Sequence, residues 1–326
     1  MATILEIKNV KKSFPGFCLG EVNMTLEPGY ILGVIGENGA GKSTLARLIL
    51  TGIGMENMTT ENTLRNMGKA PLTVQKQTCA KGDILIHGIS ERYHGKEAKE
   101  HLAFVMAQCP FSMALGAMAN AEIYGTAYAG WEQETFEQYL RQYHIPQKRP
   151  LRRLSKGQQI LFQLAFARAH QATLYVMDEP SGNLDVAHQQ LLLDAMQEIV
   201  AKGEASIVYI THRLEDLEQV GDYILWLEQG KQIAWMSKEE LLEQYLLVTG
   251  TKKQLDYVNS VKPHALFQME EGEYHQEALV RRNVELPLQL EGRTPTLQEL
   301  MVYENAWKKQ TNTSLFETET YGKKGC

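Results

Sequence analysis

The chain has 326 residues, of which 44% are hydrophobic and 22% charged, as in a globular protein large enough for more than one domain. Its formal net charge of −6 provides no global positive field, which argues against a partner made of nucleic acid. The four cysteines lack C-x-x-C spacing, which argues against a zinc site and fits a reducing compartment. There is neither a signal-peptide pattern nor a run of about 18 apolar residues, so we expect a cytosolic chain or one bound to a membrane only through a partner.

The first part of the chain predicts strands on either side of a turn. Residues 3–8 and 22–27 alternate apolar and polar side chains, which is typical of half-buried antiparallel strands. Residues 30–35 form an apolar run that predicts a buried strand, and apolar residues at helical spacing follow from residue 45.

Residues 36–44, between that strand and that helix, fill every fixed position of the phosphate-binding loop G-x-x-x-x-G-K-[ST]. Backbone N–H groups and the helix dipole make such a loop an anion site. Lys42 is placed to reach the β- and γ-phosphates, and Ser43 to hold Mg²⁺. The sequence therefore predicts a nucleoside triphosphate site formed by Gly36, Glu37, Asn38, Gly39, Ala40, Gly41, Lys42, Ser43 and Thr44.

The middle of the chain is less regular. Residues 51–82 form a long polar connection, which we interpret as an insertion or a mobile loop. Residues 83–88 predict a short strand and a turn, and residues 96–150 are expected to be largely helical, most clearly at 131–143.

A second alternation of strands and helices follows. Residues 174–177 and 207–210 predict buried strands, with a helix over 186–202 between them. Residues 223–227 and 232–235 predict a closing hairpin.

Three further motifs carry candidate chemistry. Ser155 precedes an apolar helix and is a good N-cap, although a capped helix start alone would explain the segment. The strand ending at Asp178 and Glu179 brings two carboxylates to the edge of the sheet where ligands bind, but an acidic turn is the simpler alternative. Asp178 can hold Mg²⁺ through water, and Glu179 can polarise an attacking water. His212 ends the next strand and could contact a γ-phosphate, although a lone histidine is more often merely solvated.

The order of these motifs, together with Ser-Gly-Asn-Leu-Asp at 181–185, resembles the ATP-binding-cassette (ABC) ATPase family over roughly residues 3–236. The resemblance implies an α/β P-loop NTPase fold, with a RecA-like mixed sheet, an antiparallel β-subdomain and a helical subdomain. Lys156, the segment from Thr211, and the phrase at 295–303 resemble the ATPase subunits of two-component peptide and antibiotic exporters, an ABC-2-like branch.

The resemblance also implies site roles. Asp178 is the Walker B acid that binds magnesium, Glu179 the catalytic base and His212 the switch histidine, with Lys42 as the catalytic lysine of the Walker A loop. The signature residues, which would contact ATP held by an opposite subunit, are Ser155, Gly157 and Gln158.

Two assignments remain open. Phe14 stands where the family stacks an aromatic ring on adenine, or else it is an ordinary core residue. The Q-loop glutamine should follow a strand at 102–106, and Gln108 is the candidate Q-loop ligand of Mg²⁺, but it lies one residue late, which would put Ala107 at the key position.

The implied organisation is an ATPase core (1–95 and 151–236), a helical subdomain that contacts a membrane partner (96–150), and a small C-terminal appendage of mixed structure (237–326). The apolar stretch from Phe111 to Met118 is either the docking surface for that partner or internal packing.

The resemblance implies an ATPase with ATP and Mg²⁺ as cofactors. Its implied partners are an integral-membrane transporter subunit and a second ATPase subunit, identical or different, so that it lies in the cytoplasm at the inner face of the membrane. The transport expected is export of a peptide or drug-like substrate. One alternative is a soluble ABC protein acting on a ribosome or DNA, which a single Walker A motif and the lack of heptad coiled coils disfavour. The other alternative is a regulatory or immunity module that senses a signal through 237–326.

Overall fold

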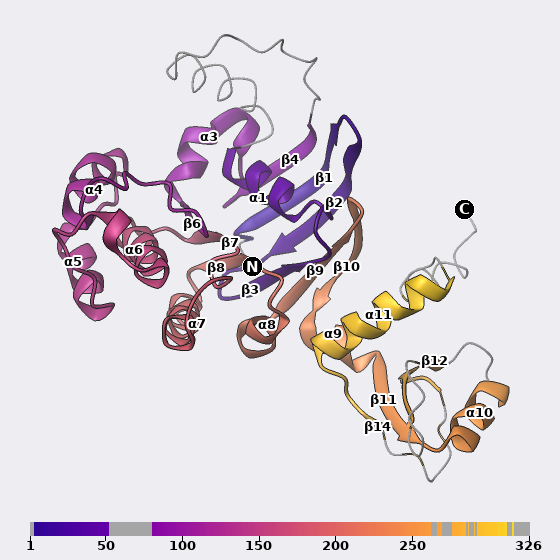
Figure 1. Cartoon of the computed structure of the whole chain (residues 1–326). Coiled ribbons are helices and arrows are strands. Elements are labelled where there is room, and N and C mark those ends of the chain that lie inside the picture. Colours follow the sequence, from indigo (N-terminus) through magenta and orange to yellow (C-terminus); the bar gives the residue numbers. More distant parts are fainter. Residues whose placement is uncertain are drawn as a thin grey trace. The chain divides into compact units, whose positions relative to one another are not determined.

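The computed structural model describes residues 3–51, 80–261, 266–268, 276–284, 286, 290, 292–311 and 315 (Figure 1). The chain divides into two compact units. The first unit is Met1–Arg213 with Leu225–Trp235, and the second is Leu214–Ile224 with Met236–Cys326. The insertion that we interpreted at 51–82 lies mostly outside the described residues.

A four-stranded sheet of the first unit has the order β2-β1-β4-β5 and is antiparallel throughout. Its strands are β1 (Leu5–Phe14), β2 (Phe17–Leu26), β4 (Lys81–Ile86) and β5 (Ile89–Ser90). Alternate residues of β1 and β2 are buried, which is the pattern that predicted these strands. Both strands extend further than the sequence indicated and meet at a short turn after Phe14.

The second sheet of this unit has six strands in the order β10-β9-β3-β8-β7-β6. The pairs β3/β8, β8/β7 and β7/β6 are parallel, so their carboxyl ends share one edge. Both faces of the central strands are buried, which explains their continuous apolar sequences. The predicted strands and closing hairpin are confirmed as β3 (Ile31–Ile35), β7 (Leu174–Asp178), β8 (Ser206–Ile210), β9 (Tyr223–Glu228) and β10 (Lys231–Ser237), and β6 is Leu102–Met106.

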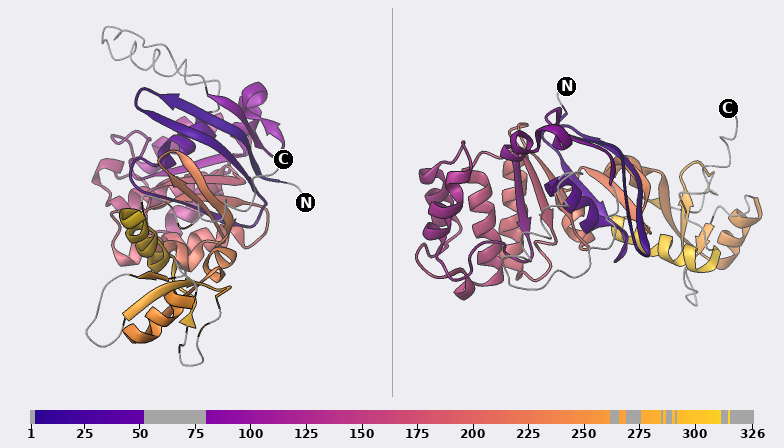
Figure 2. Two further views of the ribbon diagram at one scale, coloured as in Figure 1. Left: turned by 90° about the vertical axis from the view of Figure 1, so that its right-hand side faces the viewer. Right: turned by 90° about the horizontal axis from the view of Figure 1, so that it is seen from above.

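Helices surround this sheet and gather beyond its β6 edge (Figures 1 and 2). The strand expected before the Q-loop is confirmed as β6, which belongs to the central sheet, so the largely helical segment expected over 96–150 is interrupted near its start. The helices of the first unit are α1 (Lys42–Thr51), α3 (Glu91–Glu100), α4 (Ala117–Tyr124), α5 (Gln133–Gln142), α6 (Lys156–Ala169) and α7 (Val186–Val200).

Phe111, in the stretch considered for docking, packs inside the helical part. Its ring makes edge contacts with Tyr124 (5.4 Å between centroids), with Phe162 (5.0 Å) and with Phe166 (4.7 Å). For Phe111, therefore, internal packing is the reading that the structure shows.

The second unit has its own antiparallel sheet, in the order β12-β13-β11-β14, and its own core. Val248 of the sheet packs with Leu255 of α10 in that core. Its elements are α8 (Leu214–Val220), α9 (Lys238–Glu243), β11 (Tyr245–Gly250), α10 (Lys252–Val261), β12 (Leu266–Gln268), β13 (Gln276–Arg281), β14 (Gly292–Arg293) and α11 (Leu297–Thr311).

The phrase at 295–303 is the start of α11. Thr296 Oγ1 accepts a hydrogen bond from Glu299 N (3.1 Å), and Glu299 Oε2 accepts one from Thr296 N (2.8 Å). Arg293 bonds to both carboxylate oxygens of Glu299, which holds the pKa of this side chain down at about 2. The phrase thus encodes a capped helix. Within the ranges that the structure describes, no helix is long and apolar enough to cross a membrane.

Candidate functional site

The phosphate-binding loop connects β3 to α1, as the sequence predicts. Gly36 has φ +144°, and a Cβ at this position would lie 2.0 Å from the carbonyl oxygen of Leu227 in β9. Gly41 has φ +107°, and its Cβ would meet Leu19. Both positions therefore require glycine, so the loop is wrapped against β9 and β2.

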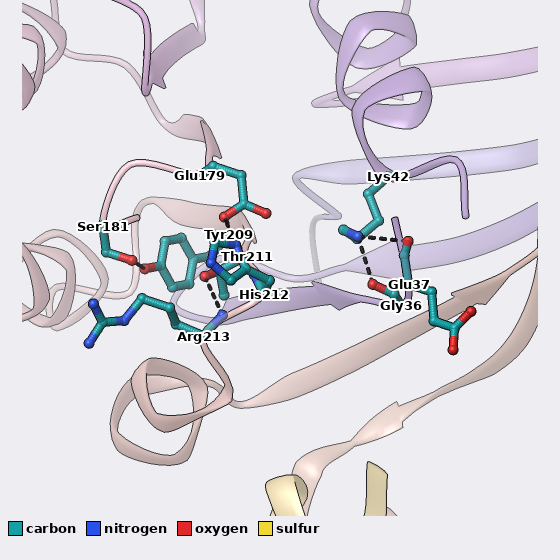
Figure 3. Close-up of polar contacts among 9 residues, drawn as sticks. All are labelled: Gly36, Glu37, Lys42, Glu179, Ser181, Tyr209, Thr211, His212 and Arg213. Atoms are coloured by element: carbon teal, nitrogen blue, oxygen red, sulfur yellow. Dashed lines mark hydrogen bonds and ion pairs between the residues drawn. The ribbon is translucent and has the colours of Figure 1, made fainter. Parts of the chain in front are cut away.

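Lys42 is the first residue of α1, at the end of this loop, and is only 7% exposed. Its Nζ donates hydrogen bonds to the carbonyl oxygens of Gly36 (2.7 Å) and Glu37 (3.0 Å), as Figure 3 shows. Burial lowers the pKa of Lys42, while Glu179 and Asp178 act in the opposite direction. The ammonium is thus held by two carbonyls that a phosphate group could replace.

Two acids lie at the end of β7, at the carboxyl edge of the sheet: Asp178 is its last residue and Glu179 follows it. Asp178 Oδ1 is buried without a hydrogen-bond partner in the described part of the chain. Burial and the charge of Glu179 raise the pKa of Asp178, and a hydrogen bond with Ser43 lowers it. A buried carboxylate oxygen beside a serine hydroxyl is the oxygen donor set that Mg²⁺ prefers, so these residues fit the ion.

A cavity of about 520 Å³ joins these groups. Its lining includes four residues with polar side chains, Ser43, Gln108, Asp178 and Glu179. The remaining lining residues are Met106, Ala107, Cys109 and Pro110. Ala107 N donates to the carbonyl oxygen of Asp178 (3.1 Å). The cavity thus includes both Gln108 and its competitor Ala107.

Glu179 and His212 meet across the ends of β7 and β8. His212 Nδ1 lies 2.6 Å from Glu179 Oε2, and the backbone N of His212 is 3.4 Å from the same oxygen (Figure 3). Glu179 has φ +52°, an uncommon conformation for a residue with a side chain. Behind the pair, Tyr209 donates to Ser181 (2.8 Å), which ties β8 to the loop after β7.

Sequence reasoning missed Gln163, which braces the cavity from α6. Gln163 Oε1 accepts from Met106 N, and Gln163 Nε2 donates to Met106 O, each at 3.0 Å. The available signal was an amide within the apolar stretch 160–167, where a buried side chain must find hydrogen-bond partners.

The signature segment starts α6. Ser155 Oγ accepts from Gln158 N (3.1 Å), and Gln158 Oε1 accepts from Ser155 N (3.2 Å). The capped helix start is confirmed, with Ser155 and Lys156 exposed and Gly157 buried. No hydrogen bond in the described residues joins this segment to residues 36–44.

Phe14 lies at the end of β1 and is 37% exposed, so it is not a core residue. The Nζ of Lys12 is 4.8 Å from the centroid of its ring, and the ring of Phe17 is 6.3 Å away. The exposed ring leaves a face to which a planar group could bind.

Comparison with known proteins shows the family of this chain. The family described as "ABC transporter" matches residues 19–182. The chain is 27% identical over 246 residues to the "ABC transporter ATP-binding protein YtrB" of Bacillus subtilis (strain 168), covering 75% of this chain and 76% of that protein. It is 30% identical over 244 residues to the "Ribose import ATP-binding protein RbsA" of Rhodopirellula baltica, but spans only 42% of that protein against 70% of this chain.

Solved structures share the fold. One described as "Structure of ATP binding subunit of ABC transporter" superimposes with a TM-score of 0.60 at 24% identity, covering 74% of this chain and 92% of its own. The cbiO1 protein of Clostridium perfringens, described as part of the ABC transporter complex cbiONQ, gives 0.58 at 16% identity, with coverages of 81% and 96%. The chain therefore belongs to the ABC transporter family, as an ATP-binding and ATP-hydrolysing subunit with the P-loop NTPase fold.

Proposed function

We propose that this subunit hydrolyses ATP at the cavity between α1 and the carboxyl ends of β6 and β7, and that it drives transport through a separate membrane subunit. The observation that carries the site is the single cavity shared by Ser43, Gln108, Asp178 and Glu179. One residue from the phosphate loop and the two acids at the end of β7 meet there, as phosphoryl transfer to water requires.

The site residues divide the work by chemistry. The loop amides and Lys42 bind the phosphates, and Ser43, Asp178 and Gln108 would hold Mg²⁺. When bound, the ion neutralises negative charge on the phosphates. Glu179 orients the attacking water and accepts its proton, while His212, bonded to Glu179 Oε2, fixes the carboxylate. Phe14 offers its exposed ring to the adenine.

The signature supplies the other wall of the nucleotide site. Ser155, Gly157 and Gln158 form no hydrogen bond to their own phosphate loop among the described residues, which supports a role toward ATP on a second subunit. ATP would then favour the closed pair of subunits to the extent that it binds that state better. One of the solved structures with this fold is described as a dimeric cassette bound to ADP and Pi.

The proposed membrane contact lies on the helices between residues 107 and 150. Because Phe111 is packed inside, the exposed side chains of α4 are the better docking candidates. Ile123 is 54% exposed and Tyr124 is 39% exposed on that helix. Apolar side chains that protrude in this way suit a partner surface. The subunit would accordingly lie at the cytoplasmic face of the membrane.

We propose export of a peptide or drug-like substrate on the basis of Lys156 and the phrase at 295–303. Uptake is the competing direction, because RbsA and the xylose relatives carry import in their names, although the chain spans about half of their length. Affinity purification of the tagged chain in mild detergent, followed by mass spectrometry, tests the proposed membrane subunit, and the identity of that subunit then indicates the direction of transport. A stoichiometric multi-spanning protein would support it, while ribosomes or DNA-bound proteins in its place would overturn it.

A further inference from the structure

The first turns of α6 and α7 meet where Gly157 of the signature lies against His188. Gly157 is buried, whereas its neighbours Ser155 and Lys156 are exposed. A Cβ built on Gly157 would lie 2.3 Å from His188 Cγ, 2.4 Å from Cδ2 and 2.7 Å from Cβ. These atoms are the base of the histidine side chain, so a larger residue at 157 could not be accommodated by a small movement at its tip.

His188 is itself held in place by the loop before α7. Its Nδ1 lies 2.9 Å from Oδ1 and 2.7 Å from Oδ2 of Asp185. Asp185 Oδ1 also accepts a hydrogen bond from the backbone N of His188 (2.9 Å), which caps α7. These hydrogen bonds to His188 lower the pKa of Asp185. The ring therefore cannot turn away from Gly157 without releasing the carboxylate.

We propose that His188 is a positioning residue. Through its contact with Gly157 it sets the position of the signature segment relative to α7, and it links that segment to Asp185. The proposal rests on the proposed function, because the signature must contact a nucleotide for its position to matter. One reason for glycine at position 157 is close approach of its backbone to the nucleotide of the other subunit. The proposal gives a different reason, which is contact with a side chain of the same subunit. The neighbouring position accommodates the large side chain of Lys156 because it is exposed to solvent.

A size-swap experiment separates the two reasons for glycine. The protein is the full chain, purified with the subunits that accompany it, and the readouts are kcat and KM for ATP hydrolysis. Gly157→Ala should lower kcat by about a hundred-fold with KM little changed, since a displacement of the loop is sufficient for such a loss. His188→Ala leaves a Cβ that would still be 2.7 Å from the new methyl group, whereas His188→Gly removes it.

The expected order of kcat is therefore Gly157→Ala with His188→Gly fastest, Gly157→Ala with His188→Ala next, and Gly157→Ala alone slowest. If both double variants are as slow as Gly157→Ala alone, glycine is required for approach to the nucleotide and the proposal is overturned. Full activity of Gly157→Ala would overturn it as well.

A second arm does not depend on how Gly157→Ala folds. His188→Leu keeps the bulk but loses the bond to Asp185, so kcat should fall several-fold while the thermal midpoint and ATP binding stay unchanged. His188→Asn, which can still bond to Asp185, should recover part of this loss, and Gln190→Leu at an exposed position of α7 is the control. Wild-type kcat in His188→Leu would refute the positioning role. Failure of the proposed function shows separately, as ATP binding that survives Lys42→Ala.

Discussion

The carboxamide of Gln163 bonds to both backbone groups of Met106, taking a hydrogen bond from its N–H and giving one to its C=O, each at 3.0 Å. β6 is the edge strand of the six-stranded sheet, so the amide acts as a short substitute for a neighbouring strand. Because Ala107 and Gln108 follow Met106 directly, α6 fixes the start of the loop that lines the nucleotide cavity.

Replacing Gln163 by Leu should therefore affect both stability and turnover. Two partly buried backbone groups of Met106 lose their partners, at a cost of about 1–3 kcal/mol in the free energy of unfolding. Urea unfolding measures the first effect and steady-state ATP hydrolysis the second. Gln142→Leu, at an exposed position of α5, is the matched control. Equal stability and turnover in the Gln163 variant would show that this brace is dispensable.

Glu179→Gln should retain ATP binding and lose hydrolysis. The amide keeps the shape of the side chain and a contact with His212, but it cannot accept a proton from water. Removal of a general base commonly lowers the rate by about 10²–10⁴-fold. Calorimetric titration with ATP and a phosphate-release assay measure the two properties separately. Hydrolysis at the wild-type rate would rule out Glu179 as the base.

Lys42→Ala should weaken ATP binding itself. The ammonium now bonds to two loop carbonyls and would turn to the phosphates, so its loss should cost about 1.5–3 kcal/mol of binding free energy. Titration calorimetry measures the affinity, with the exposed Lys202→Ala as a control for loss of one positive charge. Comparable affinities in the two variants would contradict the role of Lys42.

Phe14→Ala should weaken ATP binding by about 1–3 kcal/mol if the ring stacks on adenine as aromatic side chains stack on bases. Tyr30→Ala is a matched control, since Tyr30 is also 37% exposed but lies before β3, at the end of the strand away from the phosphate loop. Competition with a fluorescent nucleotide measures both affinities. The stacking assignment fails if the two variants bind ATP equally well.

Glu91, the first residue of α3, predicts a pH dependence of stability. It is 6% exposed, and neither carboxylate oxygen has a hydrogen-bond partner among the described residues. Burial raises its pKa to about 7, with Lys99 acting in the opposite direction. The folded state therefore binds a proton that the unfolded state has released, and stability falls as the pH rises from about 4.5 to about 7.

Glu91→Gln removes that titration. We expect the variant to exceed the wild type in unfolding free energy by about 1–3 kcal/mol at pH 8, with a smaller difference at pH 5. Urea midpoints at the two pH values provide the measurement. A difference that does not change with pH would mean that the Glu91 carboxyl titrates normally.

The parts of the fold that the sequence predicted are those with strong local patterns. Three such patterns each lie within a few residues: the apolar run before Gly36, the phosphate-binding loop, and the two acids at the end of β7. Their strands and loop were therefore predictable from the local sequence. The sequence pattern could not assign the segment Leu214–Ile224 to one of the two units. It lies in the unit formed by Met236–Cys326, and the contacts that place it there, such as Lys238 Nζ donating to Leu217 O, join residues distant in the chain.

The candidate site divides along the same physical line. Lys42, Asp178 and Glu179 could be predicted as site residues because phosphate chemistry dictates their types and spacing. Gln163 and His188 were not predicted, because the partner of each, Met106 or Gly157, is distant in the chain and is not specified by neighbouring residues. Only the exposed fraction of Phe14 could exclude the alternative that it is a core residue, and that exposure depends on where the β1–β2 turn lies.

The backbone of β9 and of the β9–β10 turn, which packs against the phosphate-binding loop, has a consequence for biosynthesis. Gly36 presses against Leu227 O, and Gly230 N donates to Ala40 O (3.1 Å) while its carbonyl accepts from Gly20 N (2.6 Å). The ribosome delivers the loop early and this β9–β10 turn much later, since synthesis runs from the N-terminus. A nascent chain that stops short of residue 230 thus carries the whole Walker A motif without the backbone partners that shape it. Nucleotide binding can mature only after the second half of the unit has been translated.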